Sequence, residues 1–95
     1  MNNEKVKSLQ QAREKIDQID VALIELIASR QFYVDQALRH KQTLEDVQSP
    51  QRVKEVIEKV RALAVQHAVD PDMVERLYHD MIQHFIQREL KEFRP

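Results

Sequence analysis

Several charged residues lie on or beside the apolar faces of predicted helices, where they could act on a ligand away from water. Arg30 occupies a position in the apolar series of the first segment, and Glu89 occupies one in the last. Lys41 lies eleven residues after Arg30, close to three helical turns, and so shares its face in a continuous helix. Arg13 and Arg52 border apolar series.

These charges predict a binding site for a small dianion. Buried cations need anions, and Glu89 is the one carboxylate expected to face inward beside four cations. The planar fork of arginine matches a carboxylate group. Each charge also has a structural explanation, because arginines at the edge of an apolar face commonly extend to solvent or pair with carboxylates. Glu89 could likewise lie on a frayed last turn. The joint pattern favours the ligand site.

The composition excludes several classes of active site. The chain has no cysteine, which excludes disulfides, thiolate metal sites and cysteine nucleophiles. It has no glycine, which excludes P-loops, glycine-rich dinucleotide loops and nucleophile elbows. The four histidines form no H-E-x-x-H pair, so we expect no metal site.

Charge and hydropathy bear on location and partners. Fifteen Lys and Arg against 16 Asp and Glu leave a net charge of −1, which gives no general attraction to nucleic acid or to an anionic membrane. No apolar run is long enough to span a bilayer, and residues 1–8 lack the apolar core of a signal peptide. We expect a cytoplasmic protein without nucleic-acid or membrane partners. No helix shows the exposed basic face of a helix-turn-helix DNA binder.

The elements that position these residues are predicted to be three helices in one domain, residues 1–95. Ser49-Pro50 and Asp70-Pro71 each combine a helix cap with a proline suited to the first helical position. They divide the chain into helices over about 5–41, 50–67 and 71–93. The lack of glycine argues against hairpin turns, and the fold class is therefore all-α.

The first helix is very long for so short a chain. At 37 residues it would extend about 55 Å, more than the width of a compact domain of this size. A second copy of the chain is the simplest partner, which predicts an intertwined homodimer. Arg13 and Lys41 would lie about 42 Å apart on this helix, so one small ligand could contact both only if they came from different subunits.

The order and spacing of several short motifs resemble the type II, all-helical chorismate mutases over nearly the whole chain. The motifs are Arg13-Glu14-Lys15-Ile16, Ile19-Asp20, the stretch Leu23–Arg30, Lys41, Pro50 with Arg52, and the segment Leu77–Glu89. Three further motifs are similar to the isochorismate-pyruvate lyase branch of that family: Tyr33-Val34, Ser49-Pro50-Gln51-Arg52-Val53, and Phe85-Ile86 followed by Glu89-Leu90-Lys91.

The resemblance implies a homodimer with two shared sites and no metal or organic cofactor. It implies that Arg13 from one subunit and Arg30 from the other bind the two substrate carboxylates. Lys41 would contact a carboxylate and the ether oxygen of the breaking C–O bond. The remaining positions that the resemblance assigns to substrate binding are Arg52, Val53 and Ile86.

Two departures from the family pattern refine the predicted substrate. Val53 stands where mutases often have a glutamate that holds the ring hydroxyl of chorismate, and valine cannot accept a hydrogen bond. Isochorismate carries that hydroxyl elsewhere on its ring. Glu89 stands where many members have a glutamine that donates to the ether oxygen, and a carboxyl group donates only when protonated.

These features favour an isochorismate-pyruvate lyase that forms salicylate and pyruvate, with some chorismate mutase activity. A dedicated chorismate mutase that forms prephenate is the alternative. A helical dimerisation module without enzymatic activity is a third possibility, and it would predict cations without a closed pocket. Both reactions are pericyclic, so they need positioning and fixed charges instead of a covalent intermediate.

Overall fold

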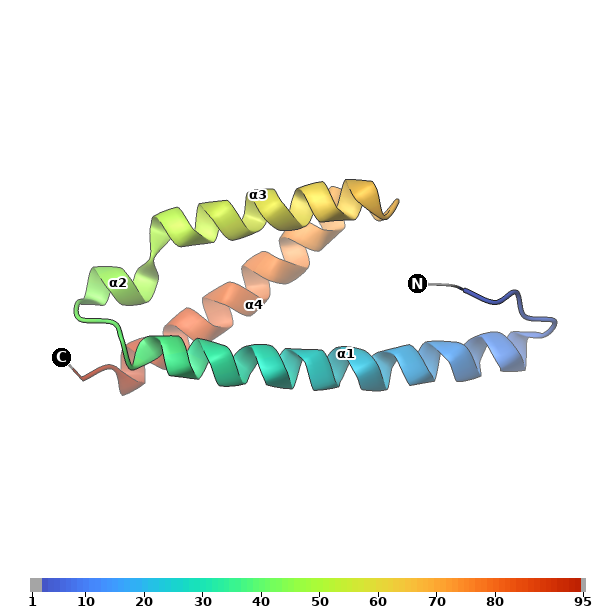
Figure 1. Ribbon diagram of the computed structural model, residues 1–95, viewed down its shortest axis with the longest axis horizontal. Coiled ribbons are helices and arrows are strands. Elements are labelled where there is room, and N and C mark those ends of the chain that lie inside the picture. Colours follow the sequence, from blue (N-terminus) through green and yellow to red (C-terminus); the bar gives the residue numbers. More distant parts are fainter. Residues whose placement is uncertain (1–2, 95) are drawn as a thin grey trace. The chain divides into compact units, whose positions relative to one another are not determined.

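The structure is a computed structural model that describes residues 3–94, and within this range every regular element is helical (Figure 1). The helices are α1 (Leu9–Leu38), α2 (Leu44–Gln48), α3 (Pro50–Gln66) and α4 (Pro71–Glu92). The all-α prediction with three long helices is confirmed. The short helix α2 lies between the first two predicted helices, in a segment where no helix was predicted. The chain divides into two compact units, Met1–Asp35 and Gln36–Pro95, which we call the first and the second unit.

Helix α1 begins at Leu9, four residues later than predicted, because side chains around residue 8 cap its first turn. The Ser8 hydroxyl accepts a hydrogen bond from the Gln11 backbone N–H at 3.1 Å, and the Gln11 side chain accepts one from Lys7 N–H at 2.9 Å. No residue of α1 is buried. Its large exposed apolar side chains include Leu9, Ile16, Ile19, Leu23, Ile24, Leu26 and Phe32.

Helix α1 ends at Leu38, so the prediction that it continues to residue 41 is wrong. The backbone N–H groups of Arg39, His40 and Lys41 each bond to the carbonyl three residues earlier, at 3.0–3.2 Å, which tightens the chain out of the α-helix. A capping box between Thr43 and Asp46 then starts α2. Lys41 therefore lies in the connection between the helices, and the argument that it shares a helix face with Arg30 fails.

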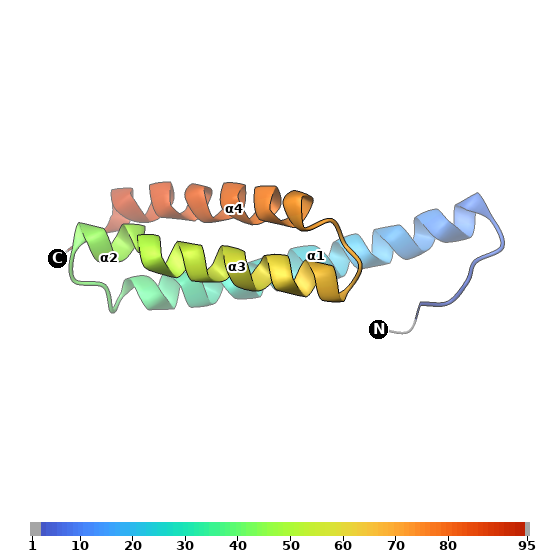
Figure 2. The same ribbon diagram turned by 90° about the horizontal axis from the view of Figure 1, so that it is seen from above.

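The second unit has its own small core. Helices α3 and α4 run in opposite directions side by side, joined by the short turn at residues 67–70 (Figure 2). Helix α2 packs on α4. The buried apolar side chains of the described residues are Val47, Val60, Ala64, Ile82 and Phe85. Those of α3 and α4 lie on the faces that the apolar spacing of these two helices predicts, whereas Val47 belongs to α2, which was not predicted.

The turn between α3 and α4 is a Schellman motif without glycine. Val69 N–H bonds to the Ala64 carbonyl at 2.8 Å and Ala68 N–H to the Val65 carbonyl at 3.2 Å. Ala68 adopts the left-handed conformation, with φ 57°. The Asp70 carboxylate then caps α4 by accepting from Asp72 N–H at 2.9 Å, as predicted.

Ser49 also adopts a left-handed conformation, with φ 44°, between α2 and α3. Pro50 occupies the start of α3 as predicted. The Ser49 side chain does not cap α3, however, and this part of the prediction is wrong. Its hydroxyl instead donates to the Asp46 carbonyl, because the left-handed backbone turns the side chain towards the end of α2.

Arg61 joins α3 to the first turn of α4. Its guanidinium donates to the Asp72 carboxylate at 2.9 Å and to the Glu75 carboxylate at 2.9 Å. These two hydrogen bonds, the one from Asp72 being the larger effect, raise the pKa of Arg61 above its ordinary value. The three side chains are partly or largely exposed, so this cluster contributes little to stability.

Candidate active site

A partly buried ion pair joins Lys41 to Glu89. The Lys41 Nζ atom lies 3.1 Å from Glu89 Oε2, and their side chains are 22% and 3% exposed. Glu89 is the single buried charged residue among residues 3–94. The sequence predicts this position, because Glu89 follows Phe85 by one turn on the apolar face of α4. Its inward placement is confirmed.

The pair leaves Lys41 with capacity to bind an anion. An ammonium group has three N–H donors, and Glu89 accepts from one of them. A carboxylate buried with one cation is stabilised by a charge-assisted hydrogen bond. Substrate charge would therefore have to be matched by Lys41 together with further cations, since Glu89 already neutralises one positive charge.

An open hollow of about 320 Å³ lies between the start of α3 and the second half of α4. Its lining residues are Gln48, Pro50, Val53, Gln83, Ile86 and Gln87. Val53 and Ile86 were singled out from the sequence, and the structure brings them together here. The three glutamines were missed, although Ile86 and Gln87 lie three and four residues after Gln83, a spacing that brings these side chains to one side of α4.

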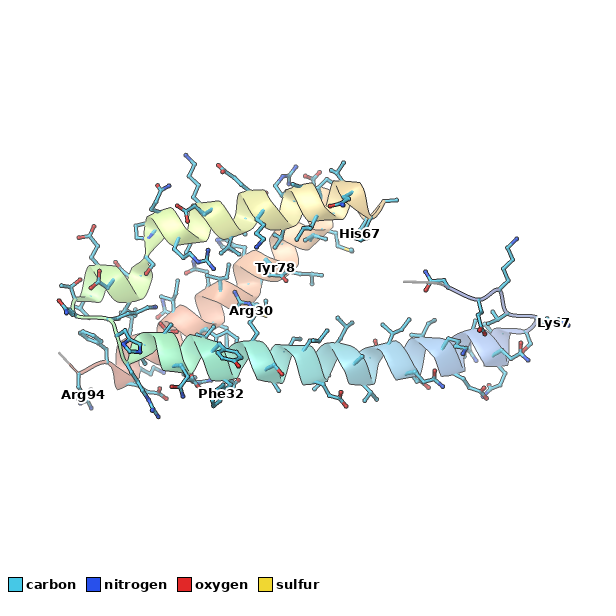
Figure 3. All side chains as sticks on the ribbon, viewed as in Figure 1. Lys7, Arg30, Phe32, His67, Tyr78 and Arg94 are labelled. Carbon is cyan, nitrogen blue, oxygen red and sulfur yellow. The ribbon has the colours of Figure 1, made fainter. Side chains whose placement is uncertain are left out.

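The three predicted arginines lie on α1 and α3, whereas Lys41 lies in the connection after α1 and Glu89 lies on α4. Arg13 and Arg30 belong to the first unit, and Arg13 is exposed whereas Arg30 is partly buried. Figure 3 labels Arg30 on the C-terminal half of α1. The two arginines are 17 positions apart, which corresponds to about 25 Å along α1. Arg52 lies in the first turn of α3, where it is exposed.

Over residues 3–94, no group of three His, Cys, Asp or Glu side chains could hold a metal ion. Within the same range, no helix is long and apolar enough to cross a membrane. The described chemistry consists of an ion pair, a hollow lined by apolar and amide side chains, and arginines on α1 and α3.

Comparison with known proteins identifies the family of this arrangement. The sequence pattern of the family described as chorismate mutase type II matches residues 12–90. The chain belongs to the chorismate mutase type II family. The match covers α1 from its second turn, all of α2 and α3, and α4 up to the residue after Glu89. The resemblance seen in the sequence is confirmed, and with it the assignment of the chain to a family of enzymes.

Two curated relatives of this chorismate mutase family member carry different names. A protein from Pseudomonas aeruginosa named isochorismate pyruvate lyase is 29% identical over 82 residues, which is 86% of this chain and 81% of that protein. A protein from Methanocaldococcus jannaschii named chorismate mutase is 29% identical over 80 residues, which is 83% of this chain and 81% of that protein. The two similarities are equal in strength, so they do not decide between the two activities.

Proposed function

We propose that the protein is an isochorismate-pyruvate lyase that also has chorismate mutase activity. The observation that carries the choice is Val53, which lines the hollow beside Ile86. A valine there provides no carboxylate to accept a hydrogen bond from the ring hydroxyl of chorismate. Isochorismate carries its hydroxyl elsewhere on the ring and does not need that acceptor. The relative named isochorismate pyruvate lyase supports the same choice.

The proposed chemistry needs only positioning and fixed charge. Arg13, Arg30 and Arg52 anchor the substrate carboxylates, and Lys41 contacts a carboxylate and the ether oxygen. Negative charge develops on that oxygen as the C–O bond breaks, and the ammonium group stabilises it. Because the electrons move in a ring, no nucleophile, metal or organic cofactor takes part. Glu89 orients Lys41 and, when protonated, donates to the ether oxygen itself.

We also propose that the active unit is a homodimer with shared sites. Arg13 and Arg30 are about 25 Å apart on one continuous helix, which is far longer than a small dicarboxylate. If both bind one substrate, they come from different subunits. The exposed apolar side chains of α1 support this arrangement, because a second copy would bury them.

A direct assay tests the proposed function. The purified protein is incubated separately with isochorismate and with chorismate, and the products are identified by mass. We expect salicylate and pyruvate from isochorismate at a higher kcat/KM than prephenate from chorismate. Turnover of chorismate alone would instead establish the second candidate, a dedicated chorismate mutase, which the relative from Methanocaldococcus jannaschii supports. No turnover of either substrate would contradict both.

A further inference from the structure

The backbone that carries Lys41 is held by the side chain of Asp46. Lys41 lies in the connection between α1 and α2, where no helix fixes its position. One oxygen of the Asp46 carboxylate accepts hydrogen bonds from the backbone N–H groups of the two residues after Lys41, Gln42 at 3.1 Å and Thr43 at 3.2 Å. In return, the Thr43 hydroxyl accepts from Asp46 N–H at 3.0 Å.

The residue next to Asp46 attaches this connection to α4. Val47 is 1% exposed, less than any other buried residue among residues 3–94, and its helix α2 packs on α4. Glu89 lies on the same α4. The chain of contacts therefore runs from α4 through Val47 to Asp46, and from Asp46 through two backbone amides to Lys41.

Lysine needs such support more than most residues. Its side chain has four flexible carbons, and fixing them in one conformation has an entropic cost. Lys41 Nζ can stay 3.1 Å from Glu89 only if its backbone is already in place. The hydrogen bond from Gln42 is the main cause that lowers the pKa of Asp46 below its ordinary value, and the charge of Lys41 lowers it further. The Asp46 carboxylate therefore interacts both with the backbone after Lys41 and with the charge of Lys41.

We propose that Asp46 is a positioning residue, whose hydrogen bonds to the backbone after Lys41 hold the lysine at Glu89 and at the reacting ether oxygen. The inference rests on the proposed function for its effect on the reaction. Its structural part, the dependence of the Lys41–Glu89 contact on Asp46, stands independently of that function. The competing explanation is that Asp46 only stabilises the start of α2.

The matched control is Asp70, a second carboxylate that accepts at the start of a helix. It accepts a hydrogen bond from a backbone N–H at the start of α4, and Lys41 takes no part in that cap. Asp46→Ala and Asp70→Ala should each lower Tm by a similar amount, because each removes a carboxylate that accepts hydrogen bonds from backbone N–H groups at the start of a helix. Only Asp46→Ala should lower kcat, by about tenfold or more, since small displacements of a reacting group are costly. Asp46→Glu should restore kcat, because glutamate is the usual residue at this position of a capping box.

A double-mutant cycle tests whether Asp46 acts through Lys41. In the Lys41→Ala background, Asp46→Ala should change kcat by less than twofold, because the group that it positions is absent. An equal loss of kcat in both backgrounds would overturn the proposal. So would an Asp46→Ala variant whose kcat equals that of Asp70→Ala.

A readout without turnover separates this inference from the proposed function. In NMR spectra, the nuclear Overhauser effect between the Lys41 ε-methylene and the Glu89 side chain should be present in the parent and in Asp70→Ala. It should be lost in Asp46→Ala, with the lysine signals assigned by their absence in Lys41→Ala. If the parent converts neither substrate, the proposed function fails while this contact still tests the positioning role. Persistence of the contact in Asp46→Ala would refute it.

Discussion

The two units of the chain differ in how they bury apolar surface. In the second unit, α2, α3 and α4 bury five apolar side chains and Glu89. In the first unit, the part of α1 up to residue 35 buries none, although it carries a long series of leucines and isoleucines. A single helix has no second layer of its own, so its apolar face stays exposed unless something outside this unit covers it.

The difference separates two requirements of the proposed site. The second unit forms the Lys41–Glu89 pair and the hollow from its own residues. The first unit contributes Arg13 and Arg30, which one small substrate cannot reach together on one helix. The comparison therefore predicts that the ion pair forms within each chain, whereas catalysis requires a second copy.

The largest expected effect tests this division directly. Arg13→Ala and Arg30→Ala should each reduce kcat/KM by a factor on the order of 10² or more, as when one charge-stabilising donor is removed. When the two variants are unfolded and refolded together, about half the dimers should be mixed, and one site of each mixed dimer would be intact. Steady-state assays should then recover about a quarter of the parental activity.

The control is each variant refolded alone, which should stay inactive. Mass spectrometry of isotope-labelled chains establishes that subunits have exchanged. Exchange without recovered activity would show that Arg13 and Arg30 do not meet at a shared site. The prediction that catalysis requires a second copy of the chain would then be wrong.

The next effect concerns the pair inside the second unit. Glu89 accepts a hydrogen bond from Lys41 as a carboxylate, but only its protonated form can donate to the ether oxygen. Activity should therefore fall on the alkaline side of the pH–rate profile, by about tenfold per pH unit. Glu89→Gln always carries a donor and should flatten that limb. An unchanged profile would assign the pH dependence to another group.

Substrate preference should respond to the hollow of the second unit. Val53→Glu introduces an acceptor for the ring hydroxyl of chorismate, and a hydrogen bond to a charged group can supply about tenfold discrimination. The ratio of mutase to lyase kcat/KM should rise by about that factor. Val53→Leu, which stays apolar, is the control. A ratio that stays constant or moves towards the lyase in Val53→Glu removes the main reason for preferring isochorismate.

A smaller effect is expected for acid stability. The hydrogen bond from Gln42 N–H, the first of several causes, holds the pKa of Asp46 below its ordinary value of 3.8. A group with a lowered native pKa stabilises the fold above its unfolded pKa and loses that contribution as pH falls through the native value. The Tm difference between the parent and Asp46→Asn should therefore shrink between about pH 6 and pH 2. A constant difference would mean that the charge of Asp46 does not contribute.

The smallest effect is expected for the salt bridges at the α3–α4 turn. Arg61→Met removes its bonds to Asp72 and Glu75, and because such exposed pairs are weak, Tm should fall by at most about 5 °C. Turnover should be unchanged. Lys59→Met, on an exposed position of the same helix, is the thermal-denaturation control. A large loss of activity would show that these salt bridges also set the angle between α3 and α4, and that the geometry of the site depends on that angle.

The sequence predicts the long helices well because their apolar spacing is regular and two prolines mark where α3 and α4 begin. It does not predict the end of α1, since Ala37 and His40 continue the helical spacing beyond the point where the backbone tightens. A five-residue helix such as α2 is too short to show any periodicity. The sequence feature that could have predicted the start of α2 is the T-x-x-D spacing of Thr43 and Asp46, which is typical of a capping box.

Within the candidate site, the sequence predicts the inward position of Glu89 but not its partner. Lys41 was assigned to a helix face, and its partner Glu89 lies 48 positions later in the chain, on a helix that folds back to it. Such a long-range contact is set by the packing of the helices, which one-dimensional spacing does not specify. The places of Arg13 and Arg52 relative to a substrate remain predictions, because they depend on a second subunit.

The left-handed conformation of Ala68 lowers the stability of the fold, and a substitution at this position could raise it. A non-glycine residue in this region costs about 1 kcal/mol, and glycine is the usual residue at the end of a Schellman motif. Ala68→Gly removes that strain at a turn that does not line the hollow. The margin so gained would offset destabilising substitutions such as Val53→Glu. Ala68→Gly would thus give the chain a single substitution that raises its stability. That added stability would let it tolerate substitutions in the site that change its substrate preference.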